Sequence, residues 1–273
     1  MLIKRKSIEA QANRKLGPGK DRELLDQPAK PPRKVKFAPV TLSEQDGVRF
    51  LHFGSEWVQG AMRLRKPDWI ELEYAQQMMA WMLFVEQPER ITQLGLGTGA
   101  LTKFCYRQFP DAQVTAVELN PSVIAICASM FKLPPSDARL TVLEMDAMDY
   151  VTDVAHHDSL DVLQVDLYDA TAKGPVLESA EFYSACAACL KPGGVMTVNL
   201  FGDHPSYLRN LKTMSYAFDQ VLCLPEVHEG NVVALAFKQK RALDFEALRA
   251  RAALITSATK LPTKAWVNGL KAK

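Results

Sequence analysis

The sequence predicts an α/β fold in which a mostly parallel, doubly wound sheet follows a small antiparallel β domain. Two observations predict this fold. From Ile91 onward, short apolar runs typical of strands alternate with segments of helical periodicity, and this alternation is typical of parallel sheets. Before Ile91, three short apolar segments are separated by turn residues such as Gly and Ser, which favours an antiparallel arrangement.

The N-terminal region divides into a tail and the small β domain. Residues 1–36 hold eleven Lys or Arg against four Asp or Glu and show almost no apolar periodicity, so we predict a flexible basic tail over residues 1–35. The small β domain is predicted over residues 36–67. Its predicted strands are Lys36–Leu42, Val48–Phe53 and Glu56–Leu64.

The larger domain is predicted over residues 68–240, and a helical extension over residues 241–273. The predicted strands are Ile91–Leu96, Gln113–Glu118, Leu140–Met145, Asp161–Asp166 and Val195–Leu200, with a closing hairpin of Val221–Leu224 and Val232–Phe237. The predicted helices are Asp68–Val85, Ala100–Gln108, Pro121–Met130, Glu178–Leu190 and Pro205–Phe218, and Asp244–Ile255 in the extension.

Composition argues against several classes of protein. The net charge of +2 is too small to indicate a nucleic-acid partner, and the apolar-rich stretch Tyr74–Val85 is too short to span a membrane. Five cysteines are an odd number for a disulfide framework and no secretory signal is visible, so we expect a cytoplasmic protein. No Cys or acidic pair completes a metal site with the adjacent His156 and His157, so we expect no metal.

A glycine-rich loop lies between a predicted strand and a predicted helix. Gly95, Gly97 and Gly99 allow tight turns and a close approach of the backbone to a ligand, and the following helix N-terminus supplies unpaired N–H groups. The spacing lacks a later glycine for a dinucleotide, which disfavours a pyrophosphate and hence a nicotinamide dehydrogenase. It suits a nucleoside with a sulfonium tail. The alternative without a ligand is an ordinary cluster of turn glycines.

Two acidic residues at strand ends extend this prediction. Glu118 ends the next strand, about twenty residues on, as expected of an acid that binds ribose hydroxyls. Asp146 follows the third strand, and its side chain and the N–H of Ala147 are suitably placed to bind an adenine edge. We therefore predict a Rossmann-like domain of the S-adenosylmethionine-methyltransferase type. Its predicted nucleoside-binding residues are Gly95, Gly97, Thr98, Gly99, Glu118, Asp146 and Ala147.

A second group of motifs follows the predicted strand Asp161–Asp166. It comprises Asp161-Val-Leu-Gln-Val-Asp166-Leu-Tyr-Asp169, then Gly174-Pro175, Glu181-Phe182-Tyr183 and Leu190-Lys-Pro-Gly-Gly194. Through these motifs, residues 40–240 resemble the spermidine synthase family of aminopropyltransferases. The resemblance implies that Asp166 is the catalytic base and Asp169 its acidic neighbour. It also implies that Glu118 holds the ribose and Asp146 the adenine amino group, and that the small β domain forms a homodimer contact.

The reaction that the resemblance implies moves an aminopropyl group from decarboxylated S-adenosylmethionine to a polyamine or a related small amine. Such an amine is cationic at neutral pH and must lose a proton before it attacks the methylene beside sulfur. A carboxylate can bind the ammonium and take that proton. Two close acids, Asp166 and Asp169, would raise the pKa of one of them, which favours a general base. The alternative for Asp166 is an ordinary acid at a strand end.

The sequence departs from the family pattern on the donor-arm and acceptor sides. Thr98 stands where the family usually carries an Asp that holds the aminopropyl ammonium, and Val227 stands where the family has a Tyr. The segment Tyr74-Ala75-Gln76-Gln77 lacks the family's Glu. Thr98 would tolerate the carboxylate of intact S-adenosylmethionine, so a methyltransferase that uses this donor is an alternative. A non-catalytic, nucleoside-binding relic of the fold is a second alternative.

Overall fold

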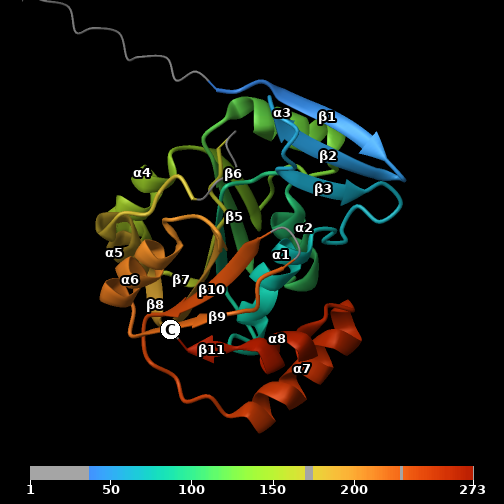
Figure 1. The fold of residues 1–273 in the computed structure, drawn as a ribbon. Coiled ribbons are helices and arrows are strands. Elements are labelled where there is room, and N and C mark those ends of the chain that lie inside the picture. Colours follow the sequence, from blue (N-terminus) through green and yellow to red (C-terminus); the bar gives the residue numbers. More distant parts are fainter. Residues whose placement is uncertain (1–36, 170–174, 228–229, 273) are drawn as a thin grey trace, which may run out of the picture. The chain divides into compact units, whose positions relative to one another are not determined.

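The computed structural model describes residues 37–169, 175–227 and 230–272 (Figure 1). From Ala38 onward the chain forms one compact unit. The predicted basic tail and Gly174 lie outside the described residues. In the part of the chain that the structure describes, no helix is both long and apolar enough to cross a bilayer.

Three antiparallel strands form the predicted small sheet, in the order β1-β2-β3. They are β1 (Val40–Gln45), β2 (Val48–Phe53) and β3 (Gly60–Arg63). The second strand coincides with its prediction. The first begins only after Pro39, which has no N–H for the ladder, and it extends to Gln45 because Asp46 and Gly47 form a two-residue turn with φ of 51° and 75°. The third strand starts at Gly60 instead of Glu56.

The main sheet of the described chain has eight strands in the order β11-β9-β10-β8-β7-β4-β5-β6. The strands from β8 to β6 are parallel to one another, and β10, β9 and β11 extend the β8 edge as antiparallel strands. Their bounds are β4 (Arg90–Leu94), β5 (Gln113–Glu118), β6 (Leu140–Glu144), β7 (Leu160–Val165), β8 (Leu190–Phe201), β9 (Gln220–Cys223), β10 (Asn231–Phe237) and β11 (Lys271–Ala272). The predicted fold class is therefore confirmed.

Helices cover both faces of the main sheet (Figure 1). One face carries α4 (Ala147–Thr152), α5 (Ala180–Cys189) and α6 (Tyr207–Ala217), and the other carries α1 (Glu73–Gln77), α2 (Ala100–Gln108) and α3 (Pro121–Met130). The predicted bounds of α2 and α3 coincide with the observed ones. The short helix α4 and the one-turn 3-10 helix Val154–His156 that follows it were not predicted.

The long helix predicted over Asp68–Val85 is wrong in length and in type. The regular helix α1 has five residues and continues as a 3-10 helix, η1 (Met78–Leu83). All six residues of η1 are buried. The Met78 carbonyl accepts hydrogen bonds from the side chains of Gln164 (3.4 Å) and Thr197 (3.1 Å) on the sheet below it. Burial on all sides and these side-chain donors favour the tighter turn over an amphipathic α-helix.

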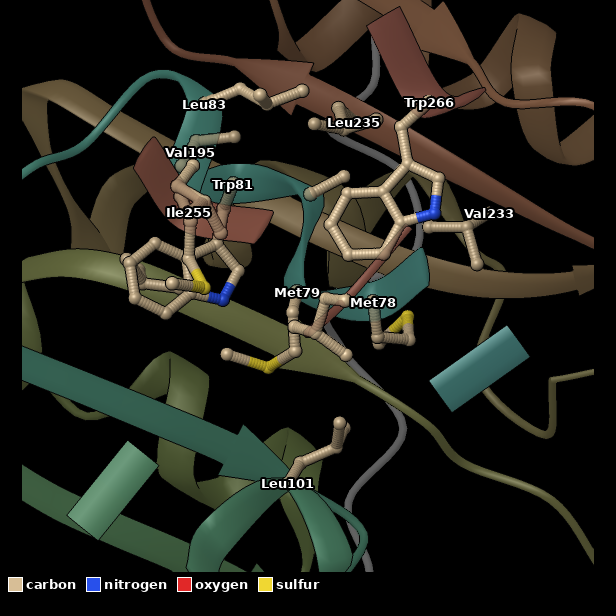
Figure 2. Packing of buried hydrophobic residues seen from close by; sticks show 14 of the residues in the cluster. Met78, Met79, Trp81, Leu83, Leu101, Val195, Val233, Leu235, Ile255 and Trp266 are labelled. Carbon is tan, nitrogen blue, oxygen red and sulfur yellow. The ribbon is translucent and has the colours of Figure 1, made fainter. Parts of the chain in front are cut away.

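The C-terminal helices cover η1 from outside. Helix α7 (Phe245–Thr259) contains the predicted helix, whereas α8 (Thr263–Gly269) and strand β11 were not predicted. Trp266 of α8 packs near Met78, Val233 and Leu235 (Figure 2). Arg251 of α7 donates from Nε to the Met82 carbonyl (3.2 Å). The extension thus closes the core around the segment that follows α1.

The gap between the predicted helix Glu178–Leu190 and the predicted strand Val195–Leu200 is a bulge in β8. Leu160 of β7 pairs with Leu190, and Val162 pairs with Val195, so a step of two residues along β7 is matched by a step of five along β8. The Lys191–Gly194 segment therefore bulges out of the ladder. The strand proper resumes at Val195, as the sequence predicts.

Candidate active site

The order in which the chain adds strands to the main sheet reverses between β4 and β7. The chain runs from β4 through β5 to β6 on one side and then returns to β7 and β8 on the other. Such a switch point leaves a crevice outside the carboxyl ends of the strands, where open α/β sheets bind ligands. Gly95 and Asp166 directly follow these two strands, and the Asp166 N–H donates to the Leu94 carbonyl (2.9 Å). The sheet therefore brings two of the predicted site segments together.

Gly95 occupies a conformation and a space that other residues cannot take. Its φ is 88°, and its N–H donates to the Val117 carbonyl (2.8 Å). A Cβ built on Gly95 would lie 2.2 Å from the main-chain oxygen of Asp166. Glycine at this position therefore lets the loop after β4 touch the loop after β7.

The rest of the glycine loop packs against the small sheet. Gly97 and Gly99 have φ of 54° and 65°, and Gly99 precedes α2 as its N-cap. Thr98 is buried, and its hydroxyl donates to the Ala61 carbonyl (3.4 Å). A Cβ built on Gly60 would lie 2.6 Å from Cγ2 of Thr98. Strand β3 therefore forms one wall of the site.

Glu118, at the end of β5, is half-buried next to this loop. Its Oε2 accepts from the Leu96 N–H (3.0 Å) and its Oε1 from the Asn120 N–H (2.8 Å). Burial raises the pKa of Glu118, and the backbone hydrogen bonds oppose that rise. The carboxylate is thus fixed against the glycine loop while each oxygen keeps a second lone pair.

Asp146 follows the neighbouring strand β6 and caps α4. Its Oδ1 accepts from the Met148 N–H (2.7 Å), which is the bond of a helix N-cap. The next residue, Ala147, is buried and opens the helix, where backbone N–H groups have no partner within the helix. The Met145 N–H donates to the Glu118 carbonyl (3.1 Å), so Asp146 and Glu118 lie on adjacent strand ends.

Asp166 is half-buried and held by two neutral side chains. Its Oδ1 accepts from Nδ2 of Asn199 on β8 (2.9 Å), and its Oδ2 accepts from the hydroxyl of Tyr74 on α1 (3.3 Å). Burial raises the pKa of Asp166, and the two hydrogen bonds oppose the rise because they favour the ionised form. A carboxylate in this setting attracts a cation, because its charge is poorly hydrated and its partners are neutral.

Asp169 lies three residues further on and is exposed. Its main-chain carbonyl accepts from Nε2 of Gln59 (3.1 Å), which links this loop to the small sheet. The sequence interpretation attributed a raised pKa in this pair to repulsion between the two acids. Burial is instead the leading cause at Asp166.

A pocket lies between the glycine loop, β3, α1 and Asp166. The described residues that line it are Gln59, Gly60, Ala61, Leu72, Tyr74, Ala75, Gln93, Leu96, Gly97, Thr98, Ala100, Leu101 and Asp166. Among these described residues, Asp166 is the one carboxylate and the one charged side chain. The pocket thus combines a neutral and partly apolar wall with a single negative charge.

Two segments that depart from the family pattern contribute buried residues near this region. Gln77 donates from Nε2 to the Pro225 carbonyl (3.1 Å), and its Oε1 is buried with no hydrogen-bond partner in the described chain. Val227 is also buried, and its N–H donates to the Asn231 carbonyl (2.9 Å). The Gln77 hydrogen bond joins α1 to the β9–β10 connection, in which Val227 lies.

Sequence reasoning missed the polar residues behind Asp166. Asn199 holds the carboxylate, Asn231 of β10 donates to Asn199 Oδ1 (2.9 Å), and the Tyr168 hydroxyl donates to the Asn199 carbonyl (3.2 Å). Burial raises the pKa of Tyr168, and the charge of Asp166 adds to that rise. One signal was available: Thr197 and Asn199 interrupt an otherwise apolar buried strand, and a buried polar side chain calls for a partner.

Comparison with known proteins gives the family. The model of the spermine/spermidine synthase domain matches residues 72–246. A polyamine aminopropyltransferase of Neisseria meningitidis serogroup A is 33% identical over 244 residues, which are 88% of this chain and 92% of that protein. A polyamine aminopropyltransferase of Chromobacterium violaceum is 34% identical over 85% of this chain and 89% of its own length.

Solved structures agree on the fold. A probable spermidine synthase from Corynebacterium glutamicum superposes with a TM-score of 0.67 at 21% identity, over 83% of this chain and 88% of that chain. Human methyltransferase-like protein 13, in complex with SAH, gives a TM-score of 0.63 at 23% identity, over 70% of this chain and 94% of its own. Fold and family thus define a Rossmann-like transferase. The chain belongs to the spermine/spermidine synthase family.

Proposed function

We propose that the chain moves an aminopropyl group from decarboxylated S-adenosylmethionine to a small amine, with Asp166 as the base. The position of Asp166 carries this proposal. Its half-buried carboxylate lines the same pocket as the glycine loop and is held by neutral donors. Membership of the spermine/spermidine synthase family and the names of the bacterial relatives support aminopropyl transfer.

The donor's nucleoside half is assigned to the three adjacent strand ends. Gly95, Gly97, Thr98 and Gly99 form the loop against which the nucleoside would lie, and Glu118 supplies acceptor lone pairs for ribose hydroxyls. Asp146 and the Ala147 N–H supply an acceptor and a donor for the adenine edge. The SAH held by the human methyltransferase-like protein 13 supports a ligand of this class on this fold.

The chemistry is a displacement at carbon. The acceptor arrives as an ammonium, Asp166 binds it and removes one proton, and the freed nitrogen attacks the methylene beside the sulfonium. A C–N bond forms, the C–S bond breaks, and the bond electrons neutralise sulfur as methylthioadenosine leaves. The raised pKa of Asp166 makes the carboxylate a better base than an exposed aspartate. Asp169, at the rim beside Gln59, is assigned to the acceptor side.

Methyl transfer from intact S-adenosylmethionine is the second candidate, and one observation favours it. Thr98 is neutral, buried and bonded to the Ala61 carbonyl, so the glycine loop offers no carboxylate for an aminopropyl ammonium. A carboxylate on the donor tail would meet no repulsion from Thr98. Against this candidate, a methyl transfer does not require a half-buried acid such as Asp166 at the acceptor side.

One assay separates the candidates. Purified protein is incubated with decarboxylated or intact S-adenosylmethionine and a panel of amines, and the nucleoside product is identified by mass spectrometry. We expect methylthioadenosine and an amine heavier by one aminopropyl group, formed only from the decarboxylated donor. Formation of S-adenosylhomocysteine from the intact donor would move the assignment to methyl transfer. Binding of either nucleoside with no product from any amine would leave the non-catalytic alternative.

Two further expectations accompany the proposal. All five cysteines are buried in the described chain, which supports an enzyme that works in the reducing cytoplasm. The small sheet is assigned as a homodimer contact by analogy with the family. Light scattering of the purified protein would give a dimer mass under this assignment and a monomer mass against it.

A further inference from the structure

Three side chains behind the pocket form a continuous hydrogen-bonded series. Asn231 donates from Nδ2 to Oδ1 of Asn199 (2.9 Å), and Asn199 donates from Nδ2 to Oδ1 of Asp166 (2.9 Å). Asn199 is 2% exposed and Asn231 is 9% exposed, so both amides are removed from solvent. We call Asn231 and Asn199 the amide relay. It ends on the carboxylate that lines the pocket.

Strand register explains how residues so far apart in sequence meet. Val165 of β7 pairs with Val198 of β8, so Asp166 and Asn199 are the next residues along this parallel pair. On the other side of β8, Asn199 pairs with Val233 of β10. Asn231 stands two residues before Val233, so it lies on the same face and forms a diagonal pair with Asn199. The amide relay therefore spans β10 and β8 and meets Asp166 at the end of β7.

Chemistry fixes the direction of the relay. An ionised carboxylate only accepts hydrogen bonds, so Asn199 must present its NH₂ group to Asp166. Its carbonyl oxygen then faces the other way and requires a donor, which the NH₂ group of Asn231 supplies. If Asn231 were an acceptor at this point, the Asn199 amide would have to turn over and would present oxygen to the carboxylate.

We propose that Asn231 is a positioning residue that acts through Asn199: it locks the Asn199 amide so that Oδ1 of Asp166 is committed to a hydrogen bond and Oδ2 is the atom that takes the proton. This inference rests on the proposed role of Asp166 as base. Oδ2 faces the hydroxyl of Tyr74, which lines the pocket and can donate or accept. The amide relay, in contrast, can only donate at Oδ1.

The surroundings of Asp166 limit what else can set its ionisation. On α1 the facing titratable group is Tyr74, and beyond β7 it is Tyr168, whose pKa the charge of Asp166 raises further. Asn199 is the facing side chain from β8, and the neighbouring β4 presents the Leu94 carbonyl to the Asp166 N–H. In the described chain, the two tyrosines are therefore the titratable groups that face this carboxylate.

The test changes the far end of the relay. Asn231→Asp places an acceptor opposite Asn199, which turns the amide over and adds a negative charge behind Asp166, and both effects disfavour ionisation of Asp166. Asn231→Ala removes the lock without adding charge. The matched control is Asn210→Ala, because Asn210 is a fully buried asparagine of α6 that bonds to Tyr183 (2.6 Å) and Glu178 (2.8 Å).

Two readouts are compared across these variants. One is the acid limb of kcat/KM against pH; the other is a carbon-13 titration of labelled aspartate carboxyls, with Asp166 assigned by its absence in Asp166→Asn. We expect Asn231→Asp to shift the acid limb of kcat/KM and the titration midpoint of the Asp166 carboxyl upward by about one pH unit. This is a tenfold change in the ionisation constant. We expect a smaller upward shift in Asn231→Ala and none in Asn210→Ala, although both lose thermal stability.

The experiment distinguishes failure of the inference about Asn231 from failure of the proposed function. If both Asn231 variants lose stability as Asn210→Ala does while the Asp166 titration stays where it is, Asn231 is merely structural and the inference is wrong. If the wild-type protein transfers no aminopropyl group, the proposed function fails, and the carbon-13 titration still decides whether the relay sets the ionisation of Asp166. Should Asn231→Asp not fold, Asn231→Ala gives the same decision.

Discussion

The main-chain oxygen of Asp166 lies against Gly95, only 2.2 Å from the position that a Cβ on Gly95 would occupy. This contact joins the loop assigned to the donor with the loop that carries the proposed base. Gly95→Ala would force the two loops apart and would also hold alanine at a φ of 88°. The contact therefore gives the first prediction.

We expect Gly95→Ala to abolish methylthioadenosine binding and to destabilise the protein by more than a matched glycine variant. The match is Gly47→Ala, because Gly47 has a φ of 75° but no atom lies within 4 Å of the position that a methyl group would take there. Backbone strain alone should cost Gly47→Ala about 1–2 kcal/mol and leave binding intact. Urea unfolding and calorimetry measure the two effects. Equal losses in both variants would show that the contact with Asp166 does not matter.

Asp166→Asn should make the protein more stable at neutral pH. The pKa of Asp166 is raised by burial, so above the ordinary value of 3.8 the folded state binds more protons than the unfolded state. Stability from this group therefore falls as the pH rises from that value through the raised pKa, and the whole penalty is present above it. We expect the melting temperature at pH 7.5 to rise by on the order of a few degrees, with no such rise at pH 3.

The exposed Asp111→Asn serves as the control for this stability measurement. It should leave the melting temperature unchanged at both pH values, because an exposed carboxylate is fully hydrated. A melting temperature that falls at pH 7.5 in Asp166→Asn would mean that the hydrogen bonds from Tyr74 and Asn199 outweigh the burial of the charge.

Methylthioadenosine binding should weaken at acidic pH through Glu118. Burial raises the pKa of Glu118, so its carboxylate begins to protonate above the ordinary value of 4.5. Protonation removes an acceptor for the ribose hydroxyls, so affinity should fall as the pH is lowered through the raised pKa. Calorimetry between pH 4.5 and 7.5 measures it. Glu118→Gln should bind about tenfold or more weakly at pH 7.5 and lose the pH dependence, because one charge-assisted bond is worth about 1.5–3 kcal/mol.

The control for that titration is Glu181→Gln, since Glu181 is exposed in the first turn of α5. Glu181→Gln should keep the wild-type affinity for methylthioadenosine and the same loss of affinity at acidic pH. If Glu118→Gln retains the wild-type pH dependence, another group controls binding and Glu118 does not hold the ribose.

Tyr74→Phe should shift the acid limb of kcat/KM upward. The Tyr74 hydroxyl donates to Oδ2 of Asp166, which favours the ionised form, and the phenylalanine ring keeps the packing. We expect a modest upward shift of the acid limb and a loss of kcat of about tenfold or less, in the range of one hydrogen bond. Tyr216→Phe is the control, because Tyr216 is 74% exposed. An unchanged acid limb of kcat/KM in Tyr74→Phe would show that the Tyr74 hydroxyl does not influence the ionisation of Asp166.

Local sequence patterns predicted the bounds of several strands and helices correctly. The strand and helix bounds at Gln113–Glu118, Ala100–Gln108 and Pro121–Met130 coincide with the structure because proline, glycine and apolar periodicity all agree there. The η1 segment was mistaken for a long α-helix, because Met, Ala, Trp and Leu fit helical spacing whether one face or all faces are buried. Periodicity alone does not distinguish these cases.

The positions of acids at strand ends were predictable from the sequence, whereas contacts with partners on distant strands were not. Asp166 and Glu118 could be placed at strand ends because each is the last residue of its predicted strand. Asn199 and Asn231 could not be linked to Asp166, because their contact depends on the register of β7, β8 and β10. The cause of the raised pKa of Asp166 was also beyond the sequence, since burial is a property of the folded chain.

The most direct test of the account is the formation of methylthioadenosine from decarboxylated S-adenosylmethionine and an excess of an accepted amine, in a single turnover at pH 7.5. The wild type, Asp166→Asn and Asp111→Asn are compared with the donor saturating. The account predicts that Asp166→Asn is slower by about 10²–10⁴-fold while its affinity for methylthioadenosine is unchanged, and that Asp111→Asn equals the wild type. Turnover by Asp166→Asn at the wild-type rate would contradict the central claim that Asp166 is the base.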